Sequence, residues 1–163
     1  MAIKNTQRGF ALLVAIIFMS VMLTFGLALG SLAYKQQVLA SSAVESQQAF
    51  YAADAALECA LYYDQQENLF AYPTVSPPPV PAMTCDNSLA SATILQQPTG
   101  TQWEIGNRVS LDGGKRCADV TVYKPAPGSG TTYIFSQGYD VSCSIVSSPG
   151  GARFAARGLK VHY

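Results

Sequence analysis

The most hydrophobic part of the chain is a run near its N-terminus. Residues 10–33 are 24 consecutive residues without a charged side chain, and Lys4 and Arg8 precede them. At about 1.5 Å of rise per residue, such a helix would extend about 36 Å, which exceeds the roughly 30 Å hydrocarbon core of a membrane. The run therefore predicts a membrane-spanning helix over residues 10–34.

A helical pattern continues beyond this run. Residues 36–66 contain neither glycine nor proline, and their apolar positions recur at spacings of three and four, as in an amphipathic helix. These positions are Phe50, Ala53, Leu57, Ala60 and Leu61. The acidic residues, which we expect largely off this stripe, are Glu45, Asp54, Glu58 and Asp64. The pattern predicts that the helix continues through residues 35–72.

The hydrophobic period changes in the C-terminal half. Residues 73–90 hold five prolines and are predicted to form an extended connector rather than a proline-rich ligand motif. Apolar and polar residues then alternate over 101–111, 116–124, 131–146 and 154–163, with glycine-rich turns between these segments. We expect an antiparallel sheet of about four strands within a head domain at 91–163, its apolar face covered by the helical stripe. The predicted class is α+β.

Charge asymmetry predicts how the apolar run is oriented. Basic residues lie before it, so the positive-inside bias places residues 1–8 in the cytoplasm and everything after residue 34 outside. All the cysteines then lie in an oxidising compartment, where disulfides are expected. They are Cys59, Cys85, Cys117 and Cys143. Of three pairings, we favour 59–85 with 117–143, although Cys117 and Cys143 fall on opposite sheet faces unless a bulge near Gly138 intervenes.

Composition argues against several functional classes. Net charge is zero and basic residues are scattered, so nucleic-acid binding is not indicated. The single histidine, His162, is predicted to be a surface residue, and neither a metal site, a cofactor nor catalytic activity is expected. Asp54 and Glu58 are predicted to be solvated carboxylates. The aromatic residues predicted as core or rim include Tyr62, Tyr63, Trp103, Tyr133 and Tyr139.

The junction before the apolar run, Gln7-Arg8-Gly9-Phe10, is similar to that of type IV prepilins. The segment QRGFALLVAI, followed by AFYAADAAL at 49–57, resembles the PilX-type minor pilins over about residues 7–61. The resemblance implies that residues 1–9 are a leader, that a prepilin peptidase cuts between Gly9 and Phe10, and that Phe10 becomes N-methylated. It also implies a pilin-like fold, other pilin subunits and an inner-membrane assembly machinery as partners, and export from that membrane to a cell-surface filament.

One position departs from the major pilins. They carry a glutamate at the fifth residue of the mature chain, where this sequence has Val14. The resemblance therefore favours a minor subunit, because a contact that major subunits use in assembly is missing. Gly26 and Gly30 supply a small-xxx-small spacing inside the run, which permits close helix contacts or local flexibility.

Three other interpretations remain open from the sequence. A pseudopilin of a type II secretion or DNA-uptake machine has the same leader and helix. A single-span anchored envelope protein would keep residues 1–9 and would not polymerise. A secreted binding domain would instead lose about 30 residues at a signal-peptidase site.

Overall fold

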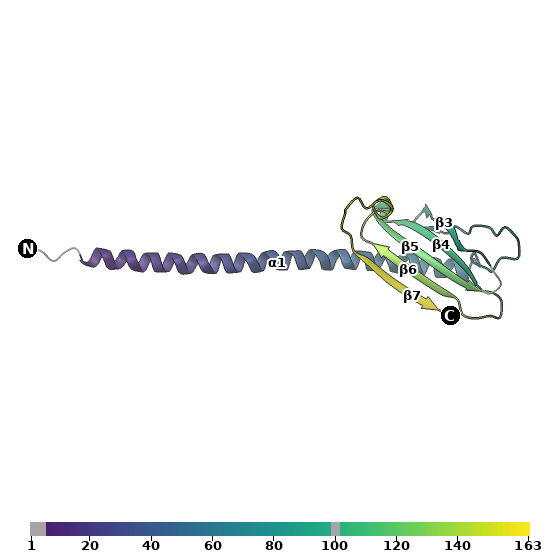
Figure 1. Cartoon of the computed structure of the whole chain (residues 1–163), viewed down its shortest axis with the longest axis horizontal. Helices are drawn as coiled ribbons and strands as arrows, with labels where there is room; N and C mark the ends of the chain where they lie inside the picture. The colour runs from purple at the N-terminus through teal and green to yellow at the C-terminus, as the bar shows by residue number, and fades with distance from the viewer. Residues whose placement is uncertain (1–5, 99–101) are drawn as a thin grey trace, which may run out of the picture. The chain divides into compact units, whose positions relative to one another are not determined.

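The computed structural model describes residues 6–98 and 102–163, and these form an α+β fold, as predicted. Helix α1 (Thr6–Gln65) is followed by a five-stranded antiparallel sheet (Figure 1). The chain divides into two compact units, Met1–Ser42 and Ala43–Tyr163, and α1 contributes residues to both. The second unit contains the sheet and the part of α1 that packs on it, and we call it the head.

The sheet has the strand order β3-β4-β5-β6-β7, in which every neighbouring pair is antiparallel. The strands are β3 (Ser91–Gln96), β4 (Gln102–Leu111), β5 (Arg116–Pro125), β6 (Tyr133–Tyr139) and β7 (Ala156–His162). The predicted turn at 112–115 is confirmed: the short 3-10 helix η1 (Asp112–Gly114) joins β4 to β5. The sheet therefore has one strand more than expected, the edge strand β3. The start of the predicted strand 101–111, Thr101, lies outside the described residues.

The connector predicted at 73–90 also contains a little regular structure. Strands β1 (Thr84–Cys85) and β2 (Ser88–Leu89) pair with each other and form a separate two-stranded sheet. Asp86 and Asn87 between them have positive φ angles, a backbone conformation that Asp and Asn tolerate better than most residues. The rest of the connector described by the structure has no helix or strand.

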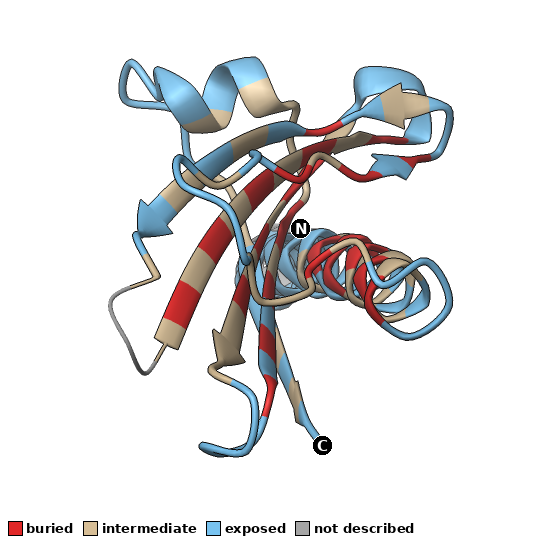
Figure 2. Cartoon of the chain, turned by 90° about the vertical axis from the view of Figure 1, so that its right-hand side faces the viewer, coloured by how far each residue is buried: buried red, intermediate tan, exposed pale blue. Residues whose placement is uncertain are grey.

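The core lies between one face of the sheet and the C-terminal part of α1 (Figure 2). Residues alternate between buried and intermediate along β4, as period-two patterning requires. The strands contribute large side chains that are 0–1% exposed, among them Trp103, Ile105 and Val109. The helix contributes mainly alanines. Large side chains of the sheet therefore pack against small side chains of the helix.

The buried face of α1 differs from the predicted stripe. Ala53 and Ala60 are fully buried, but Phe50 is 43% exposed and Leu57 and Leu61 are only partly buried. The buried face consists instead of small residues at spacings of three and four. These residues are Ala49, Ala52, Ala53, Ala56 and Ala60. Burial follows the distance to the sheet rather than side-chain size.

Gly138 in β6 explains why this face is made of alanine. A Cβ atom built at Gly138 would overlap the carbonyl oxygen of Ala49 and the backbone nitrogen of Ala53, and would lie 2.9 Å from the carbonyl carbon of Ala52. The strand backbone and the helix backbone are therefore in direct contact. Next to this contact, the Ser136 hydroxyl donates a 2.8 Å hydrogen bond to the carbonyl oxygen of Ala53.

Helix α1 ends at Gln65, so the predicted helical segment 35–72 is too long at its C-terminal end. Three residues later, Asn68 has a φ of 53°, a left-handed conformation that cannot continue a helix. The Leu69 amide then donates a 2.9 Å hydrogen bond to the carbonyl oxygen of Tyr63. Residues 66–72 contain neither the glycine nor the proline that usually marks a helix end.

The disulfides are Cys59–Cys85 and Cys117–Cys143, which is the pairing that the sequence favoured. The first joins α1 to β1, and the second joins β5 to the short helix α2 (Cys143–Ser147). The strand predicted over 131–146 is wrong beyond Tyr139, because β6 ends there. Cys143 therefore lies outside the sheet and bonds to Cys117 on the face opposite α1. The β5–β6 register has no bulge at Gly138, and the disulfide does not require one.

We expect the Cys117→Ser, Cys143→Ser double variant to lose about 3 kcal/mol of unfolding free energy, because the bond closes a segment of 26 residues. Urea unfolding of the full chain in detergent micelles can be followed by the emission of Trp103, which is the only tryptophan and is 1% exposed. An unchanged urea midpoint would contradict this expectation.

Candidate functional site

The N-terminal part of α1 exposes apolar side chains on all sides. Every residue from 10 to 45 is exposed, and the values include 72% for Phe10, 75% for Met19 and 68% for Leu27. By length and composition, α1 contains a segment that could cross a membrane. A helix that is apolar all round requires lipid or other apolar helices as its surroundings.

Hydroxyl groups within this segment form local hydrogen bonds. The side chains of Ser20, Thr24 and Ser31 each donate to the carbonyl oxygen three residues earlier, at 2.8, 2.8 and 2.9 Å. A hydroxyl that is bonded within its own helix costs less to place in an apolar environment than an unbonded one. The polar residues of the segment are thus compatible with lipid or with packed helices.

The predicted assembly residues lie on this exposed part of α1. Phe10 and Val14 are 72% and 36% exposed, and a Cβ at Gly26 or Gly30 would meet no atom within 4 Å. Both pairs are four residues apart, so each pair shares a helix face. The backbone is helical at Gly9 and Phe10, whereas residues 1–5 of the predicted leader lie outside the described residues.

A polar cluster in the head was not predicted. Asp64, expected on the exposed side of α1, is buried, with a side chain that is 1% exposed. Lys124 of β5 contacts both of its carboxylate oxygens, at 2.6 and 2.7 Å. The hydroxyl of Tyr163 donates a third hydrogen bond to Asp64. This cluster joins the end of α1, the central strand β5 and Tyr163, which follows β7.

Burial and the Asp64 carboxylate both raise the pKa of the Tyr163 hydroxyl above its ordinary value. Burial is the larger cause, and the hydrogen bond and charge of Asp64 add to it. Tyr163 therefore remains a neutral donor at physiological pH. The cluster holds two charges and one neutral hydroxyl, an arrangement suited to linking elements rather than to proton transfer.

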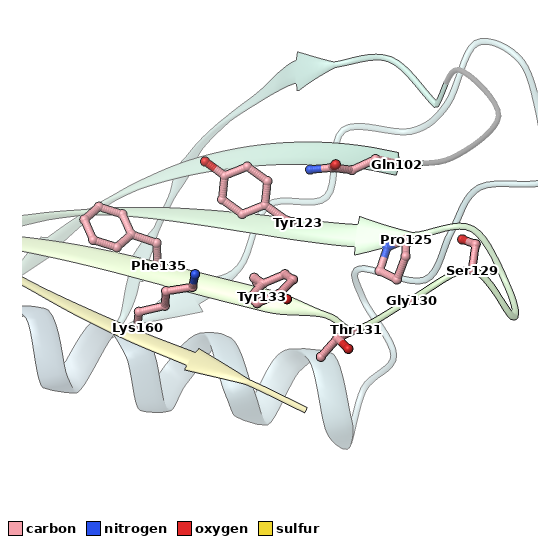
Figure 3. Close-up of a pocket in the computed structure, with 9 residues that line it drawn as sticks. All are labelled: Gln102, Tyr123, Pro125, Ser129, Gly130, Thr131, Tyr133, Phe135 and Lys160. Carbon is pink, nitrogen blue, oxygen red and sulfur yellow. The ribbon is translucent and has the colours of Figure 1, made fainter.

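The sheet face opposite α1 bears a group of aromatic and basic side chains around a pocket. Tyr123, Tyr133 and Phe135 lie side by side there with Lys160, around a pocket of about 680 Å³ (Figure 3). The pKa of Tyr123 is raised by burial and by the nearby Glu104 carboxylate. Tyr133, which was predicted as core or rim, is 39% exposed and lines this pocket.

The other predicted aromatic and polar residues have varied surroundings. Trp103 and Tyr139 are buried and Tyr62 is exposed, while Tyr63 is partly buried. Asp54 is partly buried and Glu58 is exposed. Among residues 6–98 and 102–163, no three side chains of the metal-binding types come together.

Comparisons with protein-family models, curated proteins and solved structures give no match for this chain.

Proposed function

We propose that this chain is a structural subunit of a type IV pilus-like filament, with the role of a minor pilin. The observation that carries the proposal is the exposed apolar segment of α1, which runs in the same helix into the buried alanine face of the head. In a soluble domain such a segment would expose its apolar side chains to water. A subunit that moves from a membrane into a helical filament core keeps them in apolar surroundings.

The hydrophobic effect makes this transfer feasible. In lipid, the side chains of residues 10–33 avoid water, and in a filament core they would avoid it against the same segment of other subunits. Val14 supports the role of minor subunit, because it lacks the charge with which the glutamate of major pilins contacts a neighbouring subunit. Gly26 and Gly30 leave open space on one face, where another helix could approach closely.

The junction suggests how the subunit is prepared. Prepilin peptidase would cut between Gly9 and Phe10 and methylate the new amine of Phe10. The precursor would reside in the inner membrane with the leader in the cytoplasm and the head outside. An inner-membrane assembly machinery would then insert the subunit into the filament, which carries it to the cell surface.

Intact mass spectrometry of the membrane-extracted protein, with and without a co-expressed prepilin peptidase, tests this function. We expect loss of residues 1–9 and gain of one methyl group only when the peptidase is present. The Gly9→Leu variant should remain uncut, while the matched control Gly26→Leu should be processed normally.

Two other results would overturn the filament proposal. A leader retained in the presence of active peptidase would indicate a single-span envelope protein, and an N-terminus near Ser31 would indicate a secreted domain. A processed chain that assembles only with secretion-machine subunits would instead identify a pseudopilin, which shares the apolar segment and the junction.

A further inference from the structure

The pocket on the sheet face opposite α1 is built from four adjacent strands and one loop. Tyr123 on β5 pairs with Tyr133 on β6, and Phe135 pairs with Lys160 on β7, so all four side chains lie on the same face. Gln102 of β4 and Ser129 of the β5–β6 loop complete its edge (Figure 3). Aromatic rings thus form the floor, and an amide and a hydroxyl lie at the rim.

Lys160 gives the pocket a positive charge that is available to a ligand. Its ammonium lies 4.5 Å from the centre of the Tyr133 ring, and it forms no ion pair within the described parts of the chain. Arg108, a basic residue on the same face, is already paired: its Nε lies 2.6 Å from Oδ1 of Asp119. The ammonium of Lys160 has three donor hydrogens, so contact with a ring leaves it free to bind an anion.

The Glu104 carboxylate, which lies beside Tyr123, does not cancel this charge. Glu104 on β4 lies opposite Tyr123, whereas Lys160 is on β7, three strands away. At about 4.8 Å between neighbouring strands, the two positions are roughly 14 Å apart across the sheet, beyond the screening length of physiological salt. The Lys160 end of the pocket is therefore positive.

We propose that this pocket binds an acidic sugar unit of a polysaccharide, with the sugar ring on Tyr133 and its carboxylate on Lys160. A sugar ring presents C–H bonds on its faces and hydroxyls at its edge. The C–H faces pack on the electron-rich face of an aromatic ring, and the edge hydroxyls match the amide of Gln102 and the hydroxyl of Ser129. A uronic acid adds the carboxylate that the unpaired ammonium attracts.

The dimensions of the pocket agree with such a ligand. Its volume of about 680 Å³ lies within the range of small-molecule sites, roughly 300–1,000 Å³. Tyr133 and Phe135 are 39% and 36% exposed, so the site opens to solvent along one side. An open site with an aromatic floor admits one unit of a longer chain whose ends continue past the pocket. This proposal does not depend on the filament.

The test is calorimetric titration of the full chain, in detergent micelles, with a tetrasaccharide of galacturonic acid and with its neutral methyl ester. We expect the acid to bind about fivefold more tightly than the ester, as an exposed ion pair permits. Lys160→Met should remove this difference, because it weakens binding of the acid more than binding of the ester. Tyr133→Ala should weaken both ligands about tenfold through loss of ring contact.

Lys115→Met is the matched control, because Lys115 is an exposed lysine outside the pocket, and it should change neither affinity. Circular dichroism will show that each variant is folded. Absence of saccharide binding, equal binding of acid and ester, or unaltered binding in both pocket variants would overturn the proposal. Tighter binding of tetraglutamate would identify a peptide site, and self-association lost in Tyr133→Ala would identify a contact between copies; either result would also overturn it.

Discussion

The Gly138→Ala variant is expected to lose about 3 kcal/mol or more of the unfolding free energy of the head, because its new methyl group has no space. The atoms that it would overlap are the backbone oxygen of Ala49 and the backbone nitrogen of Ala53. A side chain could rotate away from the methyl group, but a helix backbone cannot. The helix and sheet must therefore separate along the buried alanine face.

This separation would affect more than one contact. The hydrogen bond from Ser136 to Ala53 lies beside Gly138 and would lengthen, and the core around it would lose packing. A domain of this size has only several kcal/mol of total stability. We thus expect the variant to be largely unfolded near body temperature, with the emission of Trp103 shifted toward that of an exposed indole.

Gly106→Ala is the control for this prediction. Gly106 is also a strand glycine, but a Cβ there would meet the side chain of Leu95, with its nearest atom at 3.1 Å. Leu95 is 54% exposed and can move, so we expect a change below about 1 kcal/mol. Equal losses in the two variants, measured by urea unfolding, would show that the contact between backbones is not the cause.

The second large effect is expected at the polar cluster of the head. Lys124→Met should lose about 3 kcal/mol of unfolding free energy, because it leaves the buried Asp64 carboxylate without its cation. Tyr163 would still donate one hydrogen bond, which compensates only in part. The loss should appear as a lower urea midpoint for the full chain, again followed by Trp103.

A double variant separates the cost of an unpaired charge from the value of the pair. In Asp64→Leu, Lys124→Met, both charges are absent, and apolar side chains of similar size occupy their space. Replacing a buried pair in this way is often neutral or stabilising, so we expect most of the lost stability to return. If the double variant is no more stable than Lys124→Met, the pair itself stabilises the head and our explanation is wrong.

The overall fold was predictable because its signals are local. The apolar run, the alternation along β4 and β5 and the turn between them each follow from the spacing of residues over short distances. The end of α1 was harder to place, because no glycine or proline follows it directly, and Asn68, three residues later, has a left-handed conformation that many asparagines do not adopt. Strand β3, with the sequence SATILQ, lies at an edge and has too few alternating apolar residues to be recognised.

The misplaced residues of the head share a different cause. Phe50 is exposed and Asp64 is buried because the sheet approaches the helix through Gly138 and places Lys124 opposite Asp64. These partners are about 60 or more residues away in the sequence. Hydrophobic periodicity describes a helix by itself and contains no information about which distant strand meets it. The pocket around Tyr133 was missed for the same reason, since it combines residues of four strands.

The two disulfides also determine how far the head can be stretched. Each encloses a segment with a sequence separation of 26, which would extend by about 90 Å if it were pulled straight. When the head is pulled, the disulfides carry the force, so the two segments that they enclose do not extend. The oxidised head can therefore lengthen only by the chain outside these loops, so its extensibility under load is set by covalent connections and not only by the strength of its packing.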